Sequence, residues 1–175
     1  MIWIKPDFAW TQVFGAISGG LVGGFFGFIA NTLHRHFQFV ATRKNVSSAL
    51  IGEIEALKQR LEEKYLLTLR VELQMLREQR QYPIHHFRGE KDYAPVFHSL
   101  GHNIGYLRSP LPRDLVDWYT RLAICQEGAN ELHELTIGRN PDLLDYAAEV
   151  TEKQLDGFTE LVALAEPLIA QLSRY

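Results

Sequence analysis

The sequence predicts an all-α protein, in which one N-terminal transmembrane helix is followed by a small antiparallel bundle of three long helices. Three observations predict this fold class. Residues 8–33 carry no formal charge, apolar residues recur every three or four positions over most of the remainder, and no segment alternates as a half-buried strand would. A chain of 175 residues accommodates one small domain beside one membrane segment.

The uncharged run is interpreted as a retained membrane helix. A helix needs about 20 apolar residues to cross a hydrocarbon layer of about 30 Å, and the run is longer than that. It is also longer than the apolar region of a cleaved signal peptide, and no A-x-A-like cleavage site follows it before His34. A buried helix in a soluble core is disfavoured, because glycine is a poor helix former in water. We therefore predict a membrane anchor over residues 1–33 and a helical bundle over residues 34–175.

The charges that flank the run predict its orientation. One basic and one acidic residue precede it, whereas Arg35, Arg43 and Lys44 follow it with no acidic residue among them. The positive-inside rule then places the N-terminus outside and residues 34–175 in the cytoplasm, as a single pass through the inner membrane. We expect the same three basic residues to anchor the helix at the lipid headgroups.

Glycines gather on one half of the predicted membrane helix, and bulky residues occupy the other half. The glycines are Gly15, Gly19, Gly20, Gly23, Gly24 and Gly27, opposite Phe14, Leu21, Val22, Phe25, Phe28 and Ile29. Small residues at this spacing let a second backbone approach closely and gain dispersion contacts in lipid. Glycine is also generally common in membrane helices, which is the alternative explanation. The repeated spacing favours a helix-contact face, used for self-association or for a membrane partner protein.

The first helix of the predicted bundle carries its apolar residues in two sets. They are Leu50, Ile54, Leu57 and Leu61, and then Leu66, Leu69, Leu73 and Leu76. One extra residue separates the two sets, so we expect the apolar stripe to rotate near Lys64 and Tyr65. Tyr82-Pro83 is expected to end the helix.

An irregular loop is predicted over about residues 83–111, which are rich in proline and glycine. Its many apolar residues indicate a packed loop with short helical turns. The second helix is expected to begin near Pro110 to Pro112, with Ser109 as its cap and Gly138 at its close. Its predicted apolar face is Leu115, Trp118, Tyr119, Leu122, Cys125, Ala129 and Leu132.

The third helix has a strong start at Asn140-Pro141-Asp142: a cap, a proline in the first turn and an acidic residue. Its apolar residues alternate steps of four and three, which predicts a packing seam. The seam is Leu144, Ala148, Thr151, Leu155, Phe158, Val162, Ala165, Ile169 and Leu172. Pro167 is expected to kink the last turns. The short connection after the second helix makes these two helices antiparallel neighbours.

Two segments resemble uncharacterised single-pass bacterial membrane proteins. They are the stretch at 95–107, which reads PVFHSLGHNIGYL, and the stretch at 111–119, which reads LPRDLVDWY. In those proteins a membrane helix leads into a helix with an Ile-Gly-Glu-Ile-like start, here residues 51–54. The resemblance covers roughly residues 8–135. It implies this architecture and a bacterial or phage origin, and it implies no activity or catalytic residue.

Composition excludes several classes of function. A net charge of −3 argues against a dedicated nucleic-acid binder, although residues 34–111 are net basic and residues 112–175 net acidic. The single cysteine, Cys125, excludes an intrachain disulfide and is expected to pack as a small apolar residue. The sequence has no nucleophile elbow and no phosphate-binding glycine loop. We therefore predict no catalytic residue and no cofactor site.

Four histidines are the only candidates for a metal site. His98 and His102 stand four residues apart, and His85 and His86 lie nearby. Imidazoles at this spacing on a helix can share a transition metal. Gly101 weakens a helix there, however, and no carboxylate or cysteine completes a familiar ligand spacing. Surface or packed histidines are therefore the favoured interpretation, and no metal is expected.

These observations favour a non-enzymatic, membrane-anchored helical protein that acts through self-association or partner binding at the cytoplasmic membrane. One alternative is a membrane-perturbing effector, holin-like or antiphage, built from glycine-lined helices. Ser18 is the only hydroxyl within residues 13–30, so a water-filled pore would have a poor lining. A second alternative is an anchored enzyme or metal-binding protein with a polar cluster on the 83–111 loop.

Overall fold

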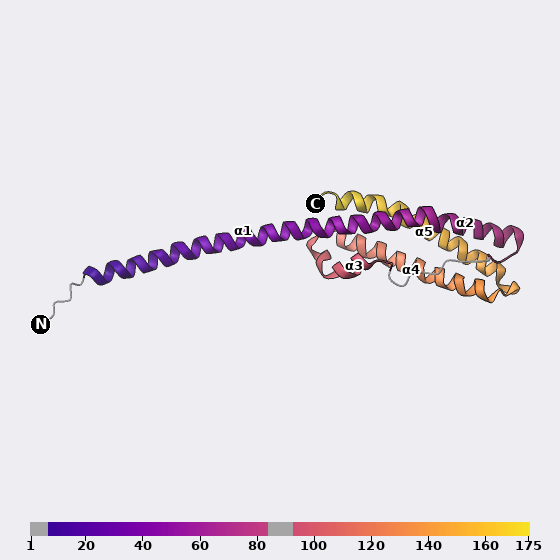
Figure 1. The fold of residues 1–175 in the computed structure, drawn as a ribbon, viewed down its shortest axis with the longest axis horizontal. Coiled ribbons are helices and arrows are strands. Elements are labelled where there is room, and N and C mark those ends of the chain that lie inside the picture. Colours follow the sequence, from indigo (N-terminus) through magenta and orange to yellow (C-terminus); the bar gives the residue numbers. More distant parts are fainter. Residues whose placement is uncertain (1–6, 84–92) are drawn as a thin grey trace. The chain divides into compact units, whose positions relative to one another are not determined.

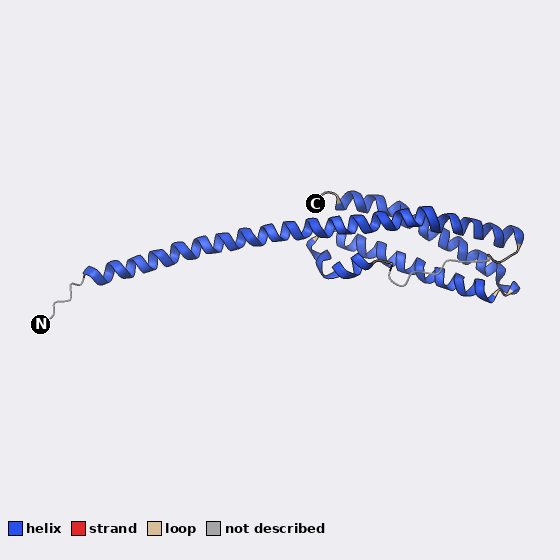
Figure 2. Cartoon of the chain, viewed as in Figure 1, coloured by secondary structure: helices blue, strands red, loops and turns tan. Residues whose placement is uncertain are grey.

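The computed structural model describes residues 7–83 and 93–175, with side chains described from Gly23 onward. The regular structure of these residues is helical throughout and contains no strand, which confirms the all-α class (Figure 2). The α-helices are α1 (Asp7–Arg60), α2 (Leu66–Gln74), α3 (Pro95–Leu100), α4 (Leu111–Gly138) and α5 (Leu144–Leu172) (Figure 1). Two π-helical turns, η1 (Leu61–Tyr65) and η2 (Met75–Gln79), and two 3₁₀ turns, η3 (Gly101–Tyr106) and η4 (Pro141–Leu143), complete the order.

The chain divides into two units, Met1–Thr42 and Arg43–Tyr175. Helix α1 runs through the boundary, so its second part is also the first helix of the bundle. The bundle unit consists of this part of α1 with α2, and of α4 and α5, with α3 and η3 in the connection between α2 and α4. The sequence predicts a division after residue 33, at the end of the membrane anchor. That boundary concerns the membrane and stays a prediction.

The extra residue in the first bundle helix is absorbed by the backbone. Leu61 and Tyr65 at the two ends of η1 are both buried, and Leu66 and Leu69 continue the buried stripe in α2. A π-helical turn holds one residue more than an α-helical turn, so the side chains that follow keep facing the core. The predicted rotation of the stripe is therefore wrong. The helix also ends before Tyr82, because Arg80 adopts a left-handed conformation with φ of 53°.

The connection to α4 contains short helical turns, α3 and η3, as predicted. Helix α4 begins at Leu111 after a cis Ser109–Pro110 peptide bond, and its first turn has no side-chain cap. The predicted capping by Ser109 is thus wrong. At the other end Gly138 is still helical, and Arg139 takes the left-handed position with φ of 44°. All seven residues of the predicted apolar face of α4 are buried.

Asn140 starts a helical segment as predicted, because its side chain accepts a hydrogen bond of 3.1 Å from the backbone N–H of Asp142; this cap belongs to the 3₁₀ turn η4, and α5 follows from Leu144. Its buried face is wider than the predicted seam and is displaced from it. Leu155, Val162 and Ile169 are only half-buried, whereas the residues one position earlier, Gln154, Leu161 and Leu168, are buried. Helix α5 packs against both α2 and α4, and contact with two neighbours requires a broader face than a two-helix seam.

Contacts between α4 and α5 confirm that these helices are antiparallel neighbours. Trp118 Nε1 donates to the Leu161 carbonyl at 2.9 Å, and Tyr146 donates to Glu131 at 2.6 Å near the other end. On the opposite side of α5, the Phe158 ring stacks on Tyr65 with ring centroids 5.7 Å apart. The core of the bundle is therefore continuous across three long helical segments.

Candidate functional site

The predicted helix-contact face lies on α1, whose backbone is helical through all six glycines. Gly15, Gly19 and Gly20 precede the first described side chain. At Gly23, Gly24 and Gly27, an added Cβ would meet no atom within 4 Å. The described part of the chain thus leaves these three positions open to a second molecule.

Large apolar side chains cover the rest of this part of α1 and are exposed. Phe25, Phe26 and Phe28 are 63%, 65% and 70% exposed. Exposed apolar residues continue past the predicted anchor as Phe37 at 68% and Val40 at 45%. Over residues 23–30 the helix is apolar on all sides, and soluble monomers rarely expose a patch of this kind.

Among the side chains that the structure describes, no helix carries an apolar stretch long enough to cross a membrane. The described side chains begin at Gly23, so residues 8–22 of the predicted transmembrane run lie outside them.

The three predicted interface anchors have different surroundings. Arg35 and Lys44 are exposed. Arg43 is half-buried and packs on the bundle, because its Nε donates to the Tyr106 carbonyl at 3.0 Å and its guanidinium lies 5.3 Å from the centre of the Tyr175 ring. Arg43 therefore binds the first helix to the end of the bundle, a contact that its sequence position did not indicate.

The candidate metal ligands are not brought together among the described residues. His98 contacts the rings of Tyr93 and Phe97, and His102 Nε2 lies 3.0 Å from the amide of Asn103. His85 and His86 lie outside the described residues. In the described ranges, no group of three or more histidine, cysteine or acidic side chains is placed to hold a metal ion.

Cys125 packs in the core between α4 and α5, as predicted. Its Sγ lies opposite Gly157, where an added Cβ would be only 2.9 Å away. Burial raises the pKa of this thiol to about 11, and the nearby Glu160 carboxylate adds to the shift. The thiol is therefore protonated at neutral pH.

Glu53 is a buried carboxylate that joins α1, α3 and α4. It accepts hydrogen bonds from the backbone N–H groups of Val96 at 2.7 Å and Phe97 at 3.0 Å, at the start of α3. It also accepts one from the Tyr119 hydroxyl at 2.7 Å. Burial, together with this hydrogen bond to a carboxylate, raises the pKa of Tyr119 above its ordinary value. The arrangement uses the carboxylate as an acceptor for three donors, which is a structural role.

Sequence reasoning missed this role of Glu53. An acidic residue within an amphipathic helix looks like one more helix-surface charge. Its partners lie 43, 44 and 66 residues away, so no local spacing indicates them. The only local sign is position, because Glu53 directly precedes Ile54 on the buried side of the helix.

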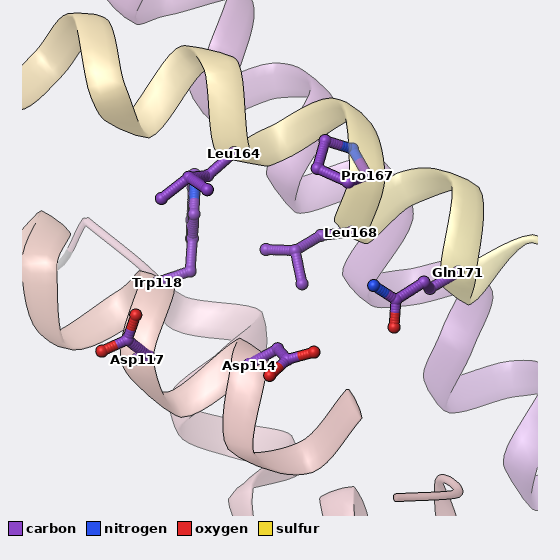
Figure 3. A pocket seen from close by; sticks show the side chains of 7 residues that line it. All are labelled: Asp114, Asp117, Trp118, Leu164, Pro167, Leu168 and Gln171. Atoms are coloured by element: carbon purple, nitrogen blue, oxygen red, sulfur yellow. The ribbon is translucent and has the colours of Figure 1, made fainter. Parts of the chain in front are cut away.

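A groove of about 170 Å³ lies between the first turns of α4 and the last turns of α5 (Figure 3). Helix α4 supplies Asp114, Asp117 and Trp118, and α5 supplies Leu164, Pro167, Leu168 and Gln171. Its floor is apolar and its acidic side is partly neutralised, because Asp117 forms an ion pair of 2.8 Å with Arg121. The groove is large enough for one side chain of another molecule rather than for a cofactor.

Comparison with known proteins adds no assignment. No protein-family model, no curated protein and no solved structure matches this chain.

Proposed function

We propose that this protein is a non-enzymatic, single-pass inner-membrane protein that acts through self-association or partner binding. Residues 1–33 serve as the anchor, with the N-terminus outside, and the helical bundle lies in the cytoplasm. The lipids of the membrane, and a second copy or a membrane partner protein, are its binding partners.

The observation that carries this proposal is the exposed apolar surface of α1. Phe25, Phe26, Phe28 and Leu33 are each more than half exposed, directly after the uncharged residues 8–22. Apolar surface gains about 25 cal/mol for each Å² that is removed from water. A chain that leaves so many large apolar groups uncovered by its own described residues is more stable when lipid covers them.

The glycine half of the same helix supports self-association. In lipid, apolar burial does not drive two helices together, so close packing of backbones has to supply the attraction. The open positions at Gly23, Gly24 and Gly27 allow such an approach. The groove between α4 and α5 offers a second, cytoplasmic contact for a partner side chain.

Crosslinking of the full chain in lipid nanodiscs or mild detergent tests self-association. We expect crosslinked oligomers for the natural sequence and mostly monomer for Gly19→Leu and Gly23→Leu, because a leucine side chain separates the backbones. Val22→Leu adds bulk to the opposite half of the helix and serves as the matched control. A chain that is monomeric throughout, or that oligomerises equally in all variants, contradicts the proposal of a glycine contact face.

A further inference from the structure

Three segments that are distant in sequence meet around Tyr175 at one end of the bundle. The Tyr175 hydroxyl accepts a hydrogen bond of 2.9 Å from the backbone N–H of Arg108, and the Arg43 guanidinium lies over its ring. Nearby, Ser47 donates a hydrogen bond of 2.5 Å to the Leu172 carbonyl. This end of the bundle therefore consists of the first bundle turns of α1, of η3 with the turn after it, and of the end of α5.

Every charged side chain in these segments is basic. We define the basic end face as Arg43, Lys44, Arg108, Arg113 and Arg174. Residues 43–52, 93–113 and 167–175 contain no acidic residue, and Asp114 is the first acid after the second of these segments. Within the described part of the chain, Lys44, Arg108, Arg113 and Arg174 are exposed and form no ion pair.

At the opposite end of the bundle, two basic residues are paired with acidic residues of α5. Arg77 forms an ion pair of 2.5 Å with Glu152, and Arg80 pairs with Asp145. The charge of the bundle is thus polarised along its length. The net acidic character of residues 112–175 begins with Asp114 and Asp117, which line the groove between the start of α4 and the end of α5.

We propose that the basic end face docks on the anionic headgroups of the membrane that α1 enters. This inference rests on the proposed anchoring of residues 1–33. Only ten residues separate Leu33 from Arg43 in the sequence, and even a fully extended chain of ten residues spans no more than about 35 Å, so the basic end face stays tethered near the membrane surface.

A lipid surface fits this face better than another polyanion for two reasons. The tether holds the face near lipid permanently, and a soluble anion has no comparable local concentration. The face also presents Tyr106, which is 39% exposed. Aromatic side chains of this kind are favourable at the membrane interface, where one side of the ring meets lipid and the other meets water.

Energy transfer from the bundle to labelled lipid headgroups tests the inference with the full chain. In a Cys125→Ala background, a donor dye is attached at His102→Cys beside the basic end face, or at Asp142→Cys at the opposite end. The chain is reconstituted in nanodiscs of phosphatidylcholine alone or of phosphatidylcholine with phosphatidylglycerol. We expect transfer from position 102 to rise with the anionic lipid and to fall at high salt, while transfer from position 142 changes little.

Charge removal provides the matched comparison. Arg108→Gln, Arg113→Gln and Arg174→Gln together should lower the ratio of docked to undocked bundle by about a hundredfold, since each basic residue near an anionic surface contributes about fivefold. Arg70→Gln, Arg77→Gln and Lys153→Gln remove the same charge elsewhere and should leave transfer from position 102 unchanged.

The outcomes distinguish this inference from the anchoring on which it rests. A chain that resists alkaline extraction from the nanodisc lipid, but whose transfer from position 102 is the same in both lipids, overturns the docking and leaves the anchor intact. Equal loss with both triple variants also overturns it, because the effect is then one of net charge. A chain that does not insert into lipid overturns the proposed anchor itself.

Discussion

At the scale of single residues, the best-defined polar interaction of the bundle is the carboxylate of Glu53. It accepts from two backbone N–H groups at the start of α3 and from Tyr119, whose ring also stacks on Phe97 with ring centroids 3.8 Å apart. One side chain thereby fixes α3 onto α1 and α4. The Tyr119 hydroxyl bond is buried and the two N–H bonds at the start of α3 are part-buried, so loss of the carboxylate leaves these donors without an equivalent acceptor.

Glu53→Ala should lower the free energy of unfolding by about 3 kcal/mol, because one buried hydroxyl and two part-buried N–H groups lose their acceptor. Tyr119→Phe removes one of the three hydrogen bonds and should cost about 1 kcal/mol. Urea denaturation followed by circular dichroism measures both values. Equal losses for the two variants would contradict the assignment of Glu53 as a shared acceptor.

Ionisation of the Cys125 thiol makes the free energy of unfolding of the bundle depend on pH in the alkaline range. Its pKa is about 11 in the fold, against 9.0 for an unperturbed thiol, so the fold favours the protonated form. The stabilising contribution is complete below pH 9.0 and is lost as the pH rises to about 11. Between about pH 7 and about pH 10.5 the loss amounts to about 2 kcal/mol. Cys125→Ala lacks this component, so its unfolding free energy should fall by correspondingly less over the same range, measured by urea titration at each pH.

At the scale of the elements, α4 and α5 approach each other closely at Gly157. A Cβ there would lie 2.9 Å from the Cys125 sulfur, closer than ordinary packing allows. Glycine in a helix costs about 1 kcal/mol relative to alanine, so a packing reason is needed for it. The contact with Cys125 supplies that reason.

The effect of Gly157→Ala on the stability of the bundle should reverse its sign when Cys125 is replaced by alanine. Gly157→Ala alone should destabilise the bundle by about 1 kcal/mol, because the overlap outweighs the gain in helix propensity. In a Cys125→Ala background the sulfur is gone, and Gly157→Ala should raise stability by a few tenths to about 1 kcal/mol. A double-mutant cycle in urea measures the coupling. Additive effects would show that the two residues do not limit the approach of the helices.

A second prediction at the scale of the elements concerns the π-helical turn η1. Deleting the exposed Lys64 should convert η1 into an ordinary α-helical turn and keep Leu61 and Leu66 on one face, with a loss below about 1 kcal/mol. Deleting the exposed Glu55 from α1 is the matched control. It shifts every later residue by about 100° and should unfold the bundle. Thermal melts followed by circular dichroism compare the two, and similar losses would contradict the role of η1.

Periodicity in the sequence predicted the helices well, and the exceptions have physical causes. The apolar face of α4 and the capping by Asn140 ahead of α5 were predictable, because they depend on local spacing and capping. The turn η1 was not, since an extra residue can either rotate the stripe or be absorbed by the backbone. The buried face of α5 depends on two neighbours, and the acceptor role of Glu53 depends on partners far along the chain. Arg43 likewise shows its role only when Tyr106 and Tyr175 are beside it.

At the scale of the whole molecule, two different surfaces require an environment that the described chain does not supply. The first part of α1 exposes phenylalanines on a helix with open glycine positions. The bundle presents a basic end face without acidic neighbours in its segments. One membrane would satisfy both surfaces, because its hydrocarbon layer covers apolar groups and its anionic headgroups attract basic ones.

Alkaline carbonate extraction of membranes from cells that produce the full chain tests the membrane anchor most directly. We expect the protein to stay in the membrane pellet, because a spanning helix is not released when electrostatic contacts are broken. A variant with Leu21→Arg and Phe25→Arg places two charges in the uncharged run and should move to the supernatant. Release of the natural sequence by carbonate would show that residues 1–33 do not anchor the protein in the membrane.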